Sequence, residues 1–80
     1  MKLHLIDYLL EIDKKGNRRD LALYKEDFGG IFLTFYVVVI TTASTRGEFE
    51  PYASSYRFSE LFVAYEEFDE LSRLLSEGRL

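Results

Sequence analysis

The sequence has no cysteine, no tryptophan and only one histidine, His4. Without cysteine the chain can form neither a disulfide framework nor a thiolate metal site, and a cysteine nucleophile is excluded. A single histidine does not supply a zinc site of the His/Cys type. A serine–histidine–acid triad would have to use His4, which lies among apolar neighbours. We therefore expect a protein that is not an enzyme and that needs no metal and no cofactor.

Long apolar runs are missing as well. The longest, residues 31–40, is interrupted by Thr34 and falls well short of the ~18 apolar residues that a membrane span needs. Asp7 interrupts the apolar N-terminus early, which argues against a signal peptide. These absences predict a cytoplasmic protein without a membrane segment. A length of 80 residues predicts one small domain over residues 1–80.

Basic residues are outnumbered, since 10 lysines and arginines accompany 14 acids, for a net charge of −4. Six bases and four acids lie in residues 1–25, whereas residues 26–80 hold four bases and ten acids. A general nucleic-acid binder presents a basic stripe, because phosphate contacts dominate its affinity. The only basic cluster here is the turn at residues 14–19, which includes Arg18 and Arg19. Direct binding of nucleic acid is therefore not expected.

Residues 2–12 fit two periodicities. As a helix, they leave a narrow polar stripe on an otherwise apolar surface. As a strand, they alternate, with His4, Ile6, Tyr8, Leu10 and Ile12 on one face and Leu3, Leu5, Asp7, Leu9 and Glu11 on the other. The Gly16-Asn17 pair that follows suits a left-handed turn, and residues 21–25 read as a second strand. We favour a β-hairpin over an N-terminal helix that ends at Gly16.

The strongest strand pattern covers residues 31–42, which are dense in β-branched and aromatic side chains. Its odd and even positions are both apolar, so this strand needs cover on both faces. Residues 43–57 are polar and are broken by Gly47 and Pro51. They predict a loop followed by an edge strand within residues 52–58.

The clearest helix pattern covers residues 59–77, with Ser59 as a candidate N-cap and Gly78 at the position after the C-terminus. The apolar positions recur at i, i+3 and i+4 and define a buried face: Leu61, Ala64, Tyr65, Phe68, Leu71, Ser72 and Leu75. The opposite face is acidic, and Asp69 is spaced for an i, i+4 ion pair with Arg73.

Together these elements predict an α+β fold, a three- or four-stranded antiparallel sheet with one C-terminal amphipathic helix packed on one face. One helix covers one face of a sheet, and the second apolar face then needs a partner. We expect a homodimer or a target-binding surface there, with self-association through Phe32, Tyr36, Val38 and Ile40. The alternative is that residues 43–57 fold back over the second face with Phe49, Tyr52 and Tyr56.

The acids are the most suggestive polar feature. Carboxylates beside exposed aromatic rings can imitate nucleic acid and engage a Lys/Arg-rich channel of a basic partner. The candidates for this contact are Glu48, Glu50, Glu66, Glu67, Asp69 and Glu70. A carboxylate-only cation site is not expected, because the helical acids project around the helix and no EF-hand spacing occurs. The alternative is a surface charge that serves solubility.

The format is an opening Met-Lys-Leu-His-Leu-Ile-Asp strand, a hairpin, a strong strand and a closing acidic helix in 80 residues. In this it resembles the small phage-encoded inhibitors of bacterial defence, anti-CRISPR proteins among them. The resemblance implies non-catalytic blocking of a CRISPR effector in the host cytoplasm and carries over no functional residue. Two alternatives stay open, an assembly subunit whose role is oligomerisation and a small nucleic-acid-binding regulator that uses Arg18 and Arg19.

Overall fold

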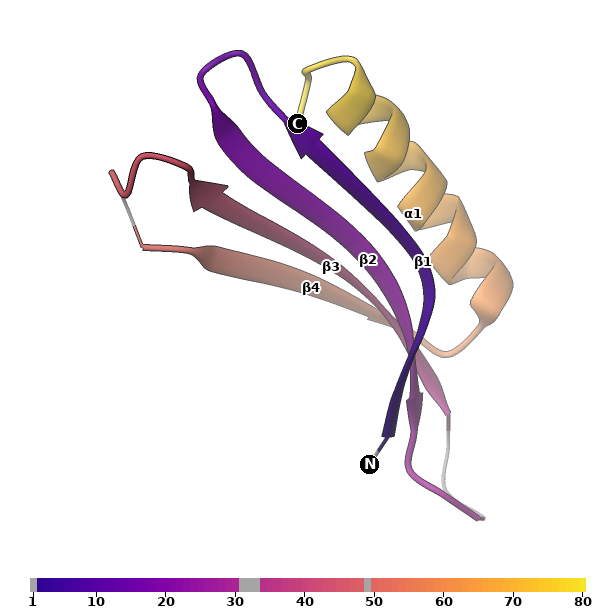
Figure 1. Cartoon of the computed structure of the whole chain (residues 1–80). Helices are drawn as coiled ribbons and strands as arrows, with labels where there is room; N and C mark the ends of the chain where they lie inside the picture. The colour runs from indigo at the N-terminus through magenta and orange to yellow at the C-terminus, as the bar shows by residue number, and fades with distance from the viewer. Residues whose placement is uncertain (1, 31–33, 49) are drawn as a thin grey trace.

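The computed structural model describes residues 2–30, 34–48 and 50–80. Its elements are β1 (Lys2–Ile12), β2 (Asn17–Asp27), β3 (Phe35–Ser44), β4 (Tyr52–Phe58) and α1 (Leu61–Ser76). The strands form one antiparallel sheet in the order β1-β2-β3-β4, and α1 lies across one side of it (Figure 1). The predicted α+β fold, with four strands and one C-terminal helix, is confirmed.

The first two strands form the hairpin that the sequence favoured, so the alternative N-terminal helix is wrong. Their turn depends on Gly16, whose φ of 84° lies in the left-handed region that glycine adopts without strain. Asp13 fixes the other side of the turn, because its Oδ1 accepts hydrogen bonds from the backbone N–H groups of Lys15 and Asn17, each at 2.9 Å. The chain therefore reverses within residues 13–16.

A β-bulge in β1 changes which side chains share a face. The register shifts between Leu5, which pairs with Tyr24, and Asp7, which pairs with Leu23. Ile6 is the extra residue of the bulge, and it packs against the core under the helix. As a result, one face of β1 carries five apolar side chains, Leu3, Leu5, Tyr8, Leu10 and Ile12. Simple alternation had divided these residues between two faces.

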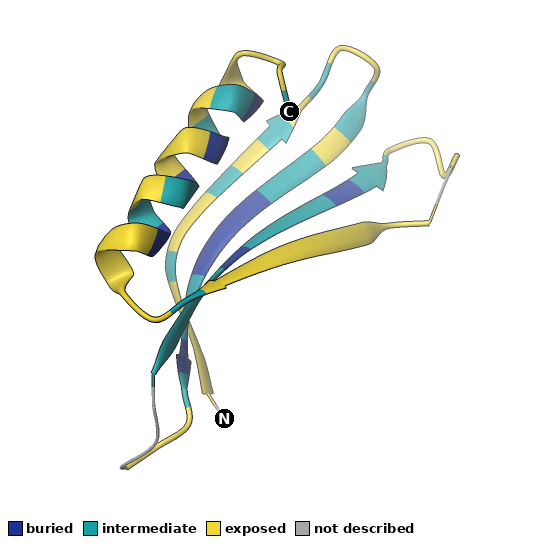
Figure 2. Cartoon of the chain, turned by 180° about the vertical axis from the view of Figure 1, so that it is seen from behind, coloured by how far each residue is buried: buried dark blue, intermediate teal, exposed yellow. Residues whose placement is uncertain are grey.

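The core lies between α1 and the two middle strands. The fully enclosed side chains of the sheet are Leu21 and Leu23 of β2 and Val38 of β3. They contact the inner face of the helix, whose buried residues are Ala64, Phe68, Leu71 and Leu75. In Figure 2 the buried positions follow the middle strands and the inner side of α1, whereas β4 is exposed along most of its length.

The two ends of α1 differ in how well their backbone groups are satisfied. At the C-terminus, Gly78 has φ 70° and its N–H donates to the Leu75 carbonyl, while the Arg79 N–H donates to the Leu74 carbonyl at 2.8 Å. This is the Schellman arrangement, and the predicted role of Gly78 is confirmed. The predicted N-cap at Ser59 is wrong, since the N-cap residue is Glu60 and it makes no side-chain capping bond.

The helix covers the even-numbered face of β3, and this corrects the residues expected to mediate self-association. Val38 is 0% exposed, and Tyr36 and Ile40 are packed against the core. The chain's own helix thus occupies the face on which these residues lie. Phe32, the fourth candidate, lies outside the described residues.

The described residues of the segment 43–57 do not fold over the sheet. Residues 43–44 end β3 and residues 52–57 belong to β4, whose Tyr52 and Tyr56 pair with Thr42 and Val38 on the helix side. The edge strand expected within residues 52–58 is confirmed as β4, whereas the alternative of a fold-back is wrong for the residues that the structure describes. Phe49 lies outside them.

Candidate interaction surfaces

The side of the sheet away from α1 is apolar and has no element of the described chain over it. We call this surface the open face and define it by residues of three strands: Leu3, Leu5, Tyr8, Leu10, Ile12, Ala22, Tyr24, Phe35, Val37 and Val39. Leu5 is 56% exposed and Ile12 is 61% exposed. The exposed part of this surface lies along β1, whereas its residues on β2 and β3 are half-buried or, for Ala22, buried. Contiguous exposed apolar side chains of this kind are typical of an interaction site.

The charges on the open face are neutralised within the chain. At one end Arg18 pairs with Asp20 at 2.9 Å and approaches the Tyr8 hydroxyl at 3.4 Å. The Asp20 carboxylate, and then the Tyr8 hydroxyl, raise the pKa of Arg18, so this residue stays charged. At the other end Arg57 binds the Glu26 carboxylate. The surface therefore offers a partner two balanced ion pairs and an apolar centre.

The pair at the second end is bidentate. Arg57 Nε donates to Glu26 Oε1 at 2.8 Å and its Nη2 donates to Oε2 at 3.1 Å. Glu26 is only 5% exposed, so its carboxylate depends on this partner. The Arg57 guanidinium also lies 5.5 Å from the centre of the Phe35 ring, and Phe28 meets that ring edge-on at 6.2 Å. This cluster joins β2 to the edge strand β4.

A second surface, the outer acidic face of α1, consists of Phe62, Glu66, Asp69 and Glu70. Phe62 is 72% exposed, the highest value among the large hydrophobic side chains that the structure describes. Glu66 and Asp69 follow it at i+4 and i+7, so the three side chains lie along one stripe of the helix. Among the described residues neither carboxylate has a cation within ion-pair distance. Glu67, also a candidate, is half-buried on the flank of this face.

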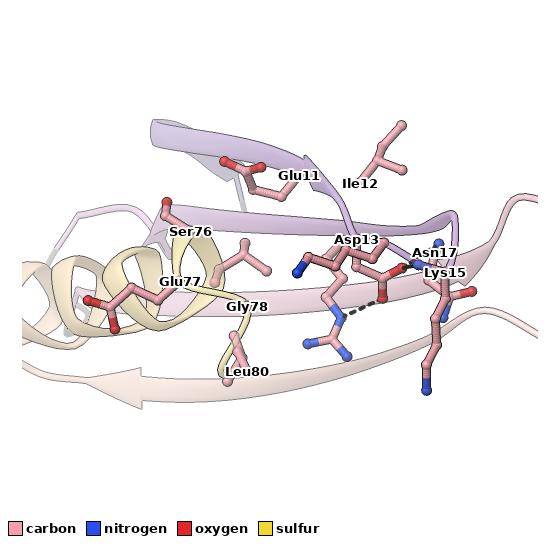
Figure 3. A pocket seen from close by; sticks show the side chains of 12 residues that line it. Glu11, Ile12, Asp13, Lys15, Asn17, Ser76, Glu77, Gly78 and Leu80 are labelled. Carbon is pink, nitrogen blue, oxygen red and sulfur yellow. Dashed lines mark hydrogen bonds and ion pairs between the residues drawn. The ribbon is translucent and has the colours of Figure 1, made fainter.

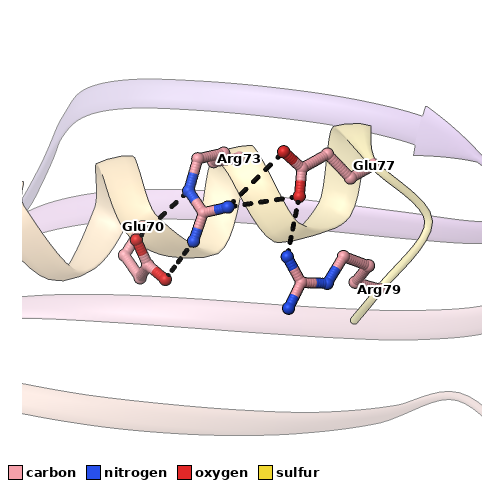
Figure 4. Close-up of polar contacts among 4 residues, drawn as sticks. All are labelled: Glu70, Arg73, Glu77 and Arg79. Atoms are coloured by element: carbon pink, nitrogen blue, oxygen red, sulfur yellow. Dashed lines mark hydrogen bonds and ion pairs between the residues drawn. The ribbon is translucent and has the colours of Figure 1, made fainter.

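The expected ion pair between Asp69 and Arg73 does not form. Arg73 instead binds Glu70 at 2.5 Å, one turn back, and Glu77 at 3.2 Å, one turn on, and Glu77 also binds Arg79 (Figure 4). The Glu70 carboxylate, with Glu77, raises the pKa of Arg73. The charge of Glu70 is therefore largely compensated, whereas those of Glu66 and Asp69 remain available to a partner.

The other two candidate acids, Glu48 and Glu50, do not lie on the outer acidic face of α1. Glu48 and Glu50 lie in the turn between β3 and β4, and both overall views show this turn at the edge of the sheet remote from α1 (Figures 1 and 2). The Glu48 N–H donates to Ser44 Oγ at 3.1 Å, so the start of this turn is ordered by a local hydrogen bond. The six predicted acids thus form two separate groups rather than one site.

A groove of about 500 Å³ separates the β1–β2 turn from the C-terminus of α1 (Figure 3). Its lining carries both signs of charge, with Lys15 and Arg19 of one sign and Asp13 and Glu77 of the other. Asp13 is already engaged by backbone N–H groups, with that of Asn17 contributing most, and these lower the pKa of its carboxyl. The mixture gives no preference for an anion or a cation.

The basic cluster at residues 14–19 is divided by the strand. Arg18 pairs with Ala43 and Arg19 with Thr42 of β3, so the two guanidinium groups leave opposite faces of the sheet. Arg18 lies on the open side, and Arg19 lines the groove on the helix side. They do not form the single basic tip that the sequence suggested.

The part of the chain that the structure describes contains no group of three metal-ligating side chains. Its one helix is too short and too polar to cross a membrane. His4 Nε2 lies 3.7 Å from Asp27 Oδ2, and both side chains are substantially exposed. This geometry is a surface contact between two strands.

Comparison with known proteins does not assign the chain to a family. No protein-family model matches the chain, and neither a curated protein nor a solved structure resembles it significantly.

Proposed function

We propose that this chain is a non-catalytic binding protein that inhibits its target by covering a basic, nucleic-acid-binding surface with the outer acidic face of α1. The observation that carries the proposal is the exposed Phe62 ring beside the carboxylates of Glu66 and Asp69, for which the described residues supply no ion-pair partner. An aromatic ring supplies contact area at low entropic cost, and the carboxylates supply attraction to lysine and arginine.

The distribution of charge supports this choice of surface. The stretch from Phe58 to Ser72 holds five acids and no base, so its charge of −5 exceeds the net charge of −4 of the whole chain. A field of one sign accelerates encounter with an oppositely charged partner. The surface resembles a nucleic-acid backbone in charge, which favours a target whose natural ligand is DNA or RNA.

The division of Arg18 and Arg19 between two faces weighs against a nucleic-acid-binding regulator, since neither face gathers the basic stripe that such binding needs. An assembly subunit remains the second candidate. The open face favours it, because a surface of that kind can serve oligomerisation alone.

The resemblance to phage-encoded inhibitors makes guide-loaded CRISPR effector complexes the first targets to test. The chain is titrated into an effector bound to labelled target DNA, and release of the DNA is followed by fluorescence anisotropy. We expect inhibition at about 0.1 M salt that weakens strongly at about 1 M, where the screening length falls to about 3 Å.

The decisive variant is the double reversal Glu66→Lys with Asp69→Lys, and its matched control is Glu48→Lys with Glu50→Lys. Both raise the net charge equally, but only the first alters the outer acidic face of α1. We expect the first to weaken inhibition about 10- to 100-fold, or ~1.4–2.7 kcal/mol, and the control to weaken it far less. Equal effects of the two pairs would leave only a non-specific charge effect and would contradict the proposal.

A further inference from the structure

We propose that the open face packs against the open face of a second copy of this chain, to give a homodimer with the layers helix, sheet, sheet, helix. The proposal depends on the sheet and not on the outer acidic face of α1. The apolar surface, its charge and its size each favour a second copy as the occupant.

A β-bulge in β1 brings apolar side chains together on the open face. Without the bulge at Ile6, Leu3 and Leu5 would lie on the opposite face from Tyr8 and Leu10. With it, the exposed apolar side chains of β1 join Tyr24 and Val37 on one surface. A bulge interrupts the ladder of backbone hydrogen bonds, so its presence here indicates that the shared face has a use.

The charges of the open face favour a copy of the same chain over a charged partner. Its two ion pairs, Arg18–Asp20 and Arg57–Glu26, are complete within one protomer. A basic protein finds no unpaired acid among the described residues of this face, and an anionic membrane finds no unpaired base. In a face-to-face dimer the two acidic helices lie on opposite outer sides, where their repulsion is weakest.

The size of the face also fits. The four strands hold 11, 11, 10 and 7 residues. At about 3.3 Å per residue and about 4.8 Å between strands, this side of the sheet measures about 600 Å² before its side-chain relief is counted. A stable interface of standard size buries about 800 Å² on each partner. Two sheets packed face to face at about 10 Å make a recurrent architecture, and their interdigitating side chains exclude water.

The oligomeric state of the full chain tests the proposal. Sedimentation velocity over a concentration series is expected to give a species of twice the protomer mass of 9.4 kDa. The double variant Leu5→Lys with Leu10→Lys is expected to weaken dimerisation about 100-fold or more, since it places two unpaired charges in an apolar contact. Leu61, which the sequence predicted to be buried, and Val63 are each 38% exposed on the helix. The matched control Leu61→Lys with Val63→Lys is expected to dimerise like the unaltered chain.

A second measurement needs no substitution. Isotope-filtered NOE spectra of a mixture of ¹³C-labelled and unlabelled chains report contacts between protomers only. We expect such contacts from the methyl groups of Leu5, Val37 and Val39. A monomer at every concentration, a dimer that the lysine pair at Leu5 and Leu10 leaves intact, or intermolecular NOEs that arise from α1 would each overturn the proposal. The inhibition assay is repeated with this lysine pair. If this variant no longer dimerises but still inhibits, the dimer proposal and the inhibitor proposal are shown to be independent of each other.

Discussion

The two faces of the sheet are both apolar, yet they differ in what covers them. On the covered face Leu21, Leu23 and Val38 are enclosed by the helix. On the open face the largest exposed side chains belong to β1, an edge strand, and nothing in the described chain shields them. Apolar content alone therefore does not identify which face of a sheet forms the core. The helix encloses the middle strands on one side, and the edge strand directs Leu3, Leu5 and Leu10 to the other.

The largest effect is expected when a leucine is replaced by alanine on each face in turn and the two losses of stability are compared. Leu23→Ala removes an enclosed side chain and is expected to cost about 2–5 kcal/mol in the free energy of unfolding. Leu5→Ala changes a side chain that is 56% exposed and is expected to cost less than about 1 kcal/mol in the isolated protomer. Chemical denaturation followed by circular dichroism measures both.

The protein concentration sharpens this test. If the open face is a dimer interface, Leu5→Ala destabilises the chain more at high concentration, where dimers form, than at low concentration. The cost of Leu23→Ala changes little with concentration, because its surroundings belong to one protomer. Equal costs of the two substitutions in dilute solution would break the distinction between the faces.

An intermediate effect is expected at the polar end of the open face. Arg57→Met keeps an unbranched side chain beside Phe35 but leaves the nearly buried Glu26 carboxylate without its partner. The expected loss is about 1–3 kcal/mol in the free energy of unfolding. Adding Glu26→Gln removes the unpaired charge and recovers part of the loss, which a double-mutant cycle measures. An Arg57→Met protein as stable as the original would mean that the pair does not hold β4 to the sheet.

The smallest effect is expected at Asp13, in the turn between β1 and β2. Backbone N–H groups, that of Asn17 first and then that of Lys15, lower the pKa of Asp13 below its ordinary value of 3.8. Its contribution to stability is therefore present above that value and is lost as the pH falls through the lower pKa of the folded state. We expect the melting temperature of Asp13→Asn to fall less between about pH 5 and about pH 2 than that of the unaltered chain. Parallel acid profiles would contradict this role of Asp13.

Much of the fold follows from local chemistry that the sequence displays. The spacing from Ala64 to Leu75 predicts the buried side of α1, and Gly78 predicts its end. Gly16 predicts the first turn, and the position of Pro51 predicts where β4 begins. These features depend on neighbours in the chain, so their causes can be read along it.

The candidate surfaces were harder to predict because they depend on contacts between distant residues. Val38 and Val39 look equally suited to a core, and only the packing of α1 assigns the first to it. The bulge at Ile6 was not predicted. The sequence signals it only by a shift in the alternating apolar pattern, from the odd positions Leu3 and Leu5 to the even positions Tyr8 and Leu10. The division of the acids between a turn and a helix follows from the path of β4.

The position of α1 after all four strands has a consequence for synthesis. Each strand can pair with the one before it as the polypeptide emerges, because the sheet order repeats the chain order. The helix leaves the ribosome after the four strands, so the leucines of β2 stay in water until residues 61–76 are available. In that interval a nascent sheet is apolar on both sides, and chaperones that recognise exposed leucine would meet their strongest substrate before α1 emerges.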